Sequence, residues 1–405
     1  MEDFLVRVGN LVPYASIPVV SALVGWFTNV LALKMTFYPV EYRGIRPFGW
    51  QGIIPSKARK MAETAVDLWT SRLIDLREEF ARIKPERVAE EMAPSVDRLS
   101  REIIDEVMDA KLPLAWSLTP EILKRNIYSS VSSELPLVVE EMMTDVKRNF
   151  DELLDLKFLA VSSLTQNKAL LNQVFQKCGE AEFRFIERSG LYFGFFFGLI
   201  QMLVWYSHPL WWILPAFGLL VGYATNYLAI KLIFRPIRPI RLGWITLQGT
   251  FIKRQAEVSA EYSRIVASRI ITVENIFEYI IRGPGSAKMG LIVQKQIERA
   301  IEHTAKSAFP MALIKPDSVV FEHIRNIAGY RFMQELPMNI RHVFGYAENA
   351  LDLENILRVK MSSLSPEAFE DFLRPVFRED EFKLILIGGI LGGIAGTLQY
   401  LFLFY

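Results

Sequence analysis

The chain has 405 residues, of which 51% are hydrophobic and 22% are charged. The formal net charge of +1 excludes an overall electrostatic attraction to nucleic acid, so any charged partner must meet a local patch. The single cysteine, Cys178, excludes a disulfide within this chain and a cysteine-based metal cage. A high apolar content beside so many charges indicates a few membrane spans joined to substantial polar segments.

Four apolar stretches are each close to the length needed to cross a bilayer. A hydrocarbon core of ~30 Å takes about 20 helical residues. In chain order the stretches are residues 11–37, 190–206, 211–234 and 384–405. We predict that each of them forms a transmembrane helix.

The segments between the spans are predicted to be helical. Apolar side chains recur in them at spacings of three and four, which draws one apolar stripe along each helix. Packing against neighbouring helices of a bundle explains such a stripe most simply, and a groove for an acyl chain or a partner helix is the alternative. The clearest stripes are Val88, Met92, Val96, Leu99, Ile103 and Val107, and Val131, Leu135, Val138, Met142, Val146, Phe150 and Leu153.

The second half of the chain repeats the first. The segment from Gly25 to Pro39 matches the segment from Gly222 to Pro236 at a constant offset (222 − 25 = 197), and the match extends to Gln51-Gly52 and Gln248-Gly249. Such a long period indicates a tandem duplication of a whole module. Near the ends of the copies the offset is 198 (388 − 190), which pairs Gly190, Gly194, Gly198 and Gln201 with Gly388, Gly392, Gly396 and Gln399.

The orientation is predicted from basic residues in the short flanks of the spans. Each copy holds two spans, so both copies cross in the same sense, as parallel repeats with a pseudo-twofold axis along the membrane normal. The link between the second and third spans has no lysine or arginine. We therefore expect both helical domains in the cytoplasm. The basic flanks are Lys34, Arg43, Arg46, Lys57, Arg59, Lys60, Arg184, Arg188, Arg235, Arg238, Arg241, Lys253 and Arg254.

These patterns predict an all-α membrane protein with four transmembrane helices and two helical cytoplasmic domains. The boundaries follow the spans. They are 1–56 for the first span and its interfacial loop, 57–187 for the first helical domain, 188–253 for the second and third spans with an interfacial loop, 254–382 for the second helical domain, and 383–405 for the fourth span.

Polar residues inside the spans are the first candidate site. Intramembrane polar groups are costly and indicate function by default, but a small-residue face with one amide is also typical of close helix packing in lipid. We favour packing, with the glycine faces of the two asparagine-bearing spans meeting each other. The candidate residues are Gly25, Thr28, Asn29, Lys34, Gly222, Thr225, Asn226 and Lys231.

The loops after the first and third spans are the second candidate site. They mix aromatic residues with arginine, a combination that suits the headgroup layer of an anionic membrane surface. Simple anchoring and specific lipid recognition both remain open. The candidate headgroup residues are Arg43, Arg46, Trp50, Arg235, Arg238, Arg241 and Trp244.

Residue patterns for catalysis or metal binding are weak. The four histidines show no pair at ligand spacing, and the segment from Gly283 to Lys288 lacks the Gly-Lys-Ser/Thr ending of a phosphate loop. We therefore expect no enzyme, no cofactor and no metal. The expected partners are membrane lipid, including anionic lipid, and proteins that meet the cytoplasmic helices, without nucleic acid.

The repeated motif resembles a known family, the uncharacterised bacterial inner-membrane proteins of the YheB and YjiN type. The second copy departs from the motif at Thr250-Phe251-Ile252 and at Ile385, which stands where the first copy has Glu187. The resemblance implies a location in the bacterial cytoplasmic membrane and supplies no mechanism. It rests on Gly25, Thr28, Asn29, Ala32, Lys34, Met35, Phe37, Pro39, residues 51–55, Glu187, Gly190 and Gly194.

The sequence thus predicts a non-enzymatic integral membrane protein of the cell envelope, acting as a scaffold or a lipid-contacting factor. The alternative is a transporter or channel with a polar pathway near Asn29 and Asn226. A wet cavity that reaches both asparagines would favour the transporter, and a dry interface would favour the scaffold.

Overall fold

The computed structural model describes residues 2–45, 49–111, 113–243, 245–307, 319–374 and 381–404. Its internal contacts divide the chain into two units. The span unit comprises Met1–Leu68, Ser163–Ile265 and Leu357–Tyr405, and the hairpin unit comprises Trp69–Ser162 and Val266–Ile356. Each of the predicted helical domains, 57–187 and 254–382, contributes residues to both units. The contacts therefore group the chain differently from the predicted boundaries, because helices of one half pack on helices of the other.

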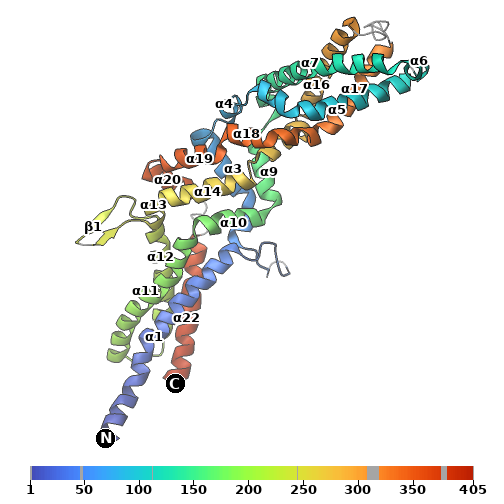
Figure 1. Ribbon diagram of the computed structural model, residues 1–405. Helices are drawn as coiled ribbons and strands as arrows, with labels where there is room; N and C mark the ends of the chain where they lie inside the picture. Colours follow the sequence, from blue (N-terminus) through green and yellow to red (C-terminus); the bar gives the residue numbers. More distant parts are fainter. Residues whose placement is uncertain are drawn as a thin grey trace. The chain divides into compact units, whose positions relative to one another are not determined.

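Four long helices of the span unit are apolar and long enough to cross a membrane, as the sequence predicted. Helix α1 packs along α11, α12 packs along α22, and α1 and α12 also contact each other. All four lie side by side in Figure 1. Their bounds are α1 (Glu2–Phe37), α11 (Glu180–Ser207), α12 (Ile213–Phe234) and α22 (Glu381–Leu403).

Short helices and one small hairpin complete the span unit. The hairpin is an antiparallel pair, β1 (Ile240–Leu242) and β2 (Ile245–Leu247), with Gly243 at φ +61° in its turn. The sequence did not predict this hairpin, because strands of three residues are too short to show an alternating pattern. The helices are α2 (Ile53–Ser56), α3 (Ala58–Leu68), α10 (Lys168–Cys178), α13 (Thr250–Lys253) and α20 (Pro366–Leu373). Three more helices have residues in both units: α9 (Leu156–Gln166), α14 (Gln255–Arg269) and α19 (Leu353–Ser362).

The hairpin unit is a helical bundle with one helical hairpin from each half of the chain. Helix α5 packs on α7, α16 packs on α17, and the two pairs join through α7 with α16 and α5 with α17. The first half supplies η1 (Trp69–Leu73), α4 (Leu76–Phe80), α5 (Pro85–Lys111), α6 (Pro113–Leu118), α7 (Glu121–Arg148) and α8 (Phe150–Leu153). The second half supplies α15 (Val273–Arg282), α16 (Ser286–Ser307), α17 (Val319–Asn339), η3 (Ile340–Val343) and α18 (Phe344–Leu351).

The apolar stripes that predicted these helices form the core of the bundle. All six stripe residues of α5 are buried, and burying each such side chain contributes roughly 1.5–3 kcal/mol relative to leaving it exposed. The ring of Phe80 lies against the rings of Phe150 and Phe277, at centroid distances of 4.6 and 6.0 Å. These contacts join α4 and α8 of the first half to α15 of the second.

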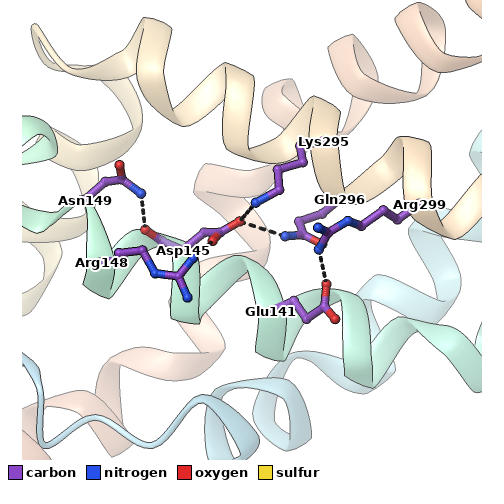
Figure 2. Close-up of polar contacts among 7 residues, drawn as sticks. All are labelled: Glu141, Asp145, Arg148, Asn149, Lys295, Gln296 and Arg299. Atoms are coloured by element: carbon purple, nitrogen blue, oxygen red, sulfur yellow. Dashed lines mark hydrogen bonds and ion pairs between the residues drawn. The ribbon is translucent and has the colours of Figure 1, made fainter.

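A buried carboxylate joins α7 to α16 (Figure 2). The side chain of Asp145 is 8% exposed, and its Oδ2 accepts hydrogen bonds from Lys295 Nζ at 2.7 Å and from Gln296 Nε2 at 2.8 Å. Burial raises the pKa of Asp145, but these two hydrogen bonds and the nearby charges outweigh burial, so the pKa is lowered overall. One turn away, Arg299 forms an ion pair with Glu141 at 2.8 Å, which extends the same contact between the halves.

Candidate functional site

In the first half of the chain, the two spans α1 and α11 cross where their glycines face each other. A Cβ added to Gly25 would overlap the carbonyl oxygen of Gly190 and would lie 3.2 Å from its carbon, so a larger residue would push α1 away from α11. One turn along α1, the buried Asn29 donates its Nδ2 hydrogen to the carbonyl oxygen of Ile186 at 2.6 Å. Thr28 donates to the carbonyl of Gly25 within its own helix, at 3.1 Å. The side-chain amide of Asn29 thus stabilises the close approach of the α1 and α11 backbones.

The second half repeats this crossing between α12 and α22. A Cβ added to Gly222 would overlap the carbonyl oxygen of Gly388 and would lie 2.8 Å from its carbon. Asn226 donates its Nδ2 hydrogen to the carbonyl oxygen of Leu384 at 2.9 Å, and Thr225 donates to the carbonyl of Gly222 at 3.2 Å. Positions that the repeat matches therefore make matched contacts (226 − 29 = 197 and 384 − 186 = 198).

The structure corrects one expectation about these glycines. The glycine faces of the two asparagine-bearing spans do not meet each other. Each meets the other span of its own half, Gly25 against Gly190 and Gly222 against Gly388. Glycines recur every four residues on α11 and α22, and a groove of bare backbone on one helix accepts a bare backbone on the other.

The two asparagines nevertheless line one cavity, of about 30 Å³. Most of the remaining lining is apolar and includes Leu33, Phe183 and Ile230. The Oδ1 atom of Asn29 is buried beside it and has no hydrogen-bond partner in the part of the chain that the structure describes. A volume of this size holds about one or two water molecules. The cavity is therefore large enough for a bound water and too small for a larger solute.

A second polar layer lies deeper in the spans and differs between the halves. In the first half, Ser21 donates its hydroxyl hydrogen to Gln201 Oε1 at 2.8 Å, and both residues are buried. The matched glutamine of the second half is Gln399, but the position matched to Ser21 is Gly218 (218 − 21 = 197). The Nε2 atom of Gln399 is buried without a hydrogen-bond partner among the described residues.

The loops after α1 and α12 close in the same way. Gln51 donates its Nε2 hydrogen to the carbonyl of Val40 at 2.7 Å, and the backbone nitrogen of Gly52 donates to the carbonyl of Pro39 at 2.9 Å. A Cβ on Gly52 would lie 2.7 Å from the carbonyl carbon of Phe37, so only glycine lets the loop return against the end of the helix. Gln248 and Gly249 make the matched contacts with Ile237, Pro236 and Phe234.

The residues predicted to meet lipid headgroups lie in these two loops. Arg43 and Trp50 face each other through paired backbone hydrogen bonds of 2.9 and 2.8 Å. Arg241 lies in β1, and the side chains of Arg43 and Arg241 are both exposed. The predicted headgroup residues Arg46 and Trp244 lie outside the described residues.

Two of the predicted headgroup arginines make ion pairs within the protein. Arg238 lies 3.5 Å from Glu367, but the arginine is 89% exposed, and such exposed pairs contribute little to stability. Arg235 lies 3.5 Å from the buried carboxylate of Glu370. Lys34 and Lys231, candidates among the intramembrane residues, are both exposed near the ends of their spans.

One buried ion pair of the span unit was missed from the sequence. The carboxylate of Glu182, near the start of α11, is fully buried, and Arg254 Nη1 donates to both of its oxygens at 2.9 Å. Burial lowers the pKa of Arg254, but its hydrogen bonds with Glu182 and Glu257 raise the pKa overall. The resemblance had singled out Glu187, which is only half-buried. This pair joins the two halves of the chain.

The hairpin unit contains an apolar cavity beside the predicted stripes, whereas the groove for an acyl chain or a partner helix stays a prediction. It has a volume of about 110 Å³ and lies between α5, α7, α16 and α17. The α7 stripe residues Val131, Leu135 and Val138 line it, together with Phe332 of α17. Its lining is almost entirely apolar. One part of the α7 stripe therefore packs in the core of the bundle, and another part lines the cavity.

Acidic, cysteine and histidine side chains are the candidate ligands for a metal ion. Within the described residues, no three of them are placed to hold a metal ion. Cys178 is buried, and burial raises the pKa of its thiol well above its ordinary value. The expectations that the protein has no metal, no cofactor and no enzymatic activity stay predictions.

No protein-family model and no solved structure matches the chain. The chain is similar to bacterial UPF0754 membrane proteins. It is 36% identical to one from Bacillus mycoides over 207 residues, which is 44% of this chain and 53% of the relative. It is 31% identical to one from Shouchella clausii over 113 residues (25% and 30%), and 37% identical to one from Bacillus cytotoxicus over 62 residues (15% and 16%). The chain therefore spans about half, or less, of the length of these relatives.

The four apolar helices and these relatives together define the class of the protein. It is an all-α integral membrane protein, and it is similar to an uncharacterised family of bacterial membrane proteins. The relatives' names give a membrane location and state no activity.

Proposed function

We propose that this protein is a non-enzymatic membrane scaffold of the bacterial cell envelope that contacts lipid. In this proposal the chain is a tandem duplication of the YheB and YjiN type in the cytoplasmic membrane. Its extramembrane helices face the cytoplasm and offer a surface to protein partners. The basic flanks of the spans support that orientation.

The proposal rests mainly on the hydrogen bonds that the two intramembrane asparagines donate. Asn29 and Asn226 each donate to a backbone carbonyl across a glycine crossing, at 2.6 and 2.9 Å. A substrate or ion pathway needs polar groups that are free to exchange partners as the solute passes. Here both side-chain amides hold two helices together, which favours a rigid scaffold.

The size of the shared cavity supports the same reading. At about 30 Å³, with an almost wholly apolar lining, it offers no continuous polar path for a solute. The transporter hypothesis retains one specific observation, that Asn29 and Asn226 line the same cavity. Water access to that cavity therefore separates the two functions.

Matched contacts support the proposal of a duplication. The crossings, the Gln-Gly loops and the short helices α2 and α13 occur at matched positions in both halves. Contact with lipid is supported by the exposed arginines Arg43 and Arg241 in the two loops. Each arginine near an anionic surface contributes about 1 kcal/mol of attraction.

Cysteine accessibility tests whether bulk water reaches the cavity between the two asparagines. In a Cys178→Ser background, Leu33→Cys and Ile230→Cys place single thiols in the cavity lining, and Lys34→Cys and Lys231→Cys place them at neighbouring exposed positions. We expect a water-soluble maleimide to label the two exposed cysteines in the folded, detergent-solubilised protein and the two cavity cysteines only after unfolding. Labelling of the cavity thiols at the rate of the exposed ones would favour a transport pathway and overturn the scaffold.

The same reagent tests the orientation. Arg59→Cys and Glu257→Cys place single thiols in the extramembrane helices. A membrane-impermeant maleimide added to intact cells should not label these thiols until the cells are opened. Labelling of either position from outside would show that the extramembrane helices face away from the cytoplasm.

A further inference from the structure

A second cavity of the span unit, of about 230 Å³, lies where α12 ends and α22 begins. Unlike the asparagine cavity, it combines charged groups with an apolar wall formed by Ile230 and Phe234. Charged groups beside an apolar wall at the end of a span suit a molecule that has both a polar head and an apolar tail. The lining consists of Tyr227, Ile230, Lys231, Phe234, Arg235, Arg374 and Glu381.

The two arginines of this cavity share one buried carboxylate. The side chain of Glu370 is 5% exposed, and it accepts a hydrogen bond from Arg374 Nη1 at 2.7 Å. Arg235 Nε lies 3.5 Å from the same oxygen of Glu370. One negative charge therefore faces two guanidinium groups, so the pair of arginines retains one uncompensated positive charge for a ligand.

The other two charged groups have no ionic partner among the described residues. Lys231 Nζ lies 3.0 Å from the hydroxyl of Tyr227 and 5.1 Å from the centre of its ring, and no carboxylate of the described residues lies within 4 Å. Glu381 likewise forms no ion pair within the described part of the chain. One ammonium and one carboxylate thus line the same cavity without being paired to each other.

The matched place in the first half keeps a lysine, Lys34, but lacks the other charged groups. Phe183 stands where the second half has Glu381 (381 − 183 = 198), and its ring packs on Phe37 at a centroid distance of 5.1 Å. Gln176 stands where the second half has Arg374 (374 − 176 = 198), and it donates to the hydroxyl of Tyr38 at 3.2 Å. This combination of charged residues is therefore specific to the second half and does not follow from the repeat.

We propose that this cavity binds the headgroup of an aminophospholipid, with its phosphodiester on Lys231 and Arg235 and its ammonium on Glu381. Lys231, Arg235 and Arg374, set against Glu370, leave a formal charge of +2 to attract one phosphodiester. The separate carboxylate complements an ammonium group, which phosphatidylglycerol lacks. The proposal deepens the lipid contact of the proposed function and rests on it.

Native mass spectrometry of the full-length protein in detergent tests the site. The protein is mixed with equal amounts of phosphatidylethanolamine and phosphatidylglycerol that carry the same acyl chains. We expect phosphatidylethanolamine to be retained preferentially. Lys231→Gln should lower its retention about tenfold, the effect of losing one charge-assisted hydrogen bond. Glu381→Gln should abolish the preference between the lipids. Lys34→Gln, at the position matched to Lys231, is the control and should change neither.

Each outcome supports or overturns the inference. Equal retention of the two lipids, or an equal effect of Lys34→Gln and Lys231→Gln, would overturn it, provided that all variants keep the wild-type thermal midpoint. Displacement of the lipid by millimolar inorganic phosphate would show that the site takes free phosphate and overturn it too. If no phospholipid is retained at all, the lipid contact of the proposed function fails as well. Retention without preference defeats only the inference.

Discussion

Two adjacent glycines of α22 allow the glycine crossing to be tested against its own control. Gly392 faces α12, and a Cβ there would overlap the carbonyl oxygen of Gly218 and lie 2.9 Å from its carbon. Gly393 points elsewhere, and a Cβ there would lie 3.5 Å from the nearest atom, on Leu219, which is an ordinary contact. Gly392→Ala should therefore destabilise the span unit, and Gly393→Ala should not.

The magnitude follows from the geometry. Ordinary contact begins at 3.4 Å, so Gly392→Ala must separate the helices by at least 0.5 Å (3.4 − 2.9). A gap of ~0.5–1 Å forfeits a quarter to a half of each dispersion contact, and overpacking of this kind typically costs about 1–3 kcal/mol. Replacing a helical glycine by alanine gains up to about 1 kcal/mol of helix propensity. Both variants share that gain, so the difference between them isolates the packing cost.

Thermal unfolding in detergent measures this difference. The span unit has about 220 residues, and for that size 1 kcal/mol shifts the midpoint by about 2–4 °C. The midpoint of Gly392→Ala should therefore lie about 2–12 °C below that of Gly393→Ala. Equal midpoints for the two variants would refute the close approach of α12 and α22. The comparison needs no reference to the wild type, so a general effect of alanine cannot produce it.

Three further predictions concern contacts that differ between the two halves or that join one half to the other. Gln399→Leu should raise the thermal midpoint because it removes a buried amide nitrogen without a hydrogen-bond partner among the described residues, and Gln201→Leu should lower the midpoint because it removes the acceptor of the Ser21 hydroxyl. The free energy of unfolding should change by about 1 kcal/mol in each case, and midpoint shifts of the same sign would contradict the prediction. Arg254→Ala should cost about 3–5 kcal/mol because Glu182 would stay buried and unpaired, and adding Glu182→Gln should recover most of the loss in the same unfolding assay. Because the pKa of Asp145 is lowered by folding, its contribution is complete above about pH 4 and is lost as the pH falls through the folded pKa. Asp145→Asn should therefore destabilise the protein at pH 7 and flatten its acid-induced loss of stability, and an unchanged acid limb would argue against this carboxylate.

The spans and their asparagines could be predicted from the sequence because both depend on local patterns. An apolar run of sufficient length gives a span, and the constant offset placed Asn29 and Asn226 in equivalent positions. The partner of each glycine face could not be predicted, because spacing shows which residues share a face and not which helix covers it. For the same reason the sequence did not show that hairpins of the two halves join in one bundle.

Charged residues show the limit of sequence reasoning more sharply. Glu182 and Glu187 lie on the same stretch of α11, and nothing in their spacing separates the buried residue from the half-buried one. Only the approach of Arg254, which is 72 residues away from Glu182 in the chain, gives Glu182 its role. The cavity at Glu381 was missed for a related reason. The repeat draws attention to residues that the halves share, whereas this cavity depends on a residue that they do not share.

The contacts between the halves also make each half depend on the other. Either half alone would leave a buried carboxylate without its cation, because Glu182 depends on Arg254 and Asp145 depends on Lys295. A buried charge without its partner is strongly destabilising, so the span unit and the hairpin unit each need residues from both halves. Within the span unit, each glycine crossing holds its own pair of spans. A position such as Glu381, which touches neither crossing, is free to differ from its counterpart, and a binding site specific to one half arises at such a position.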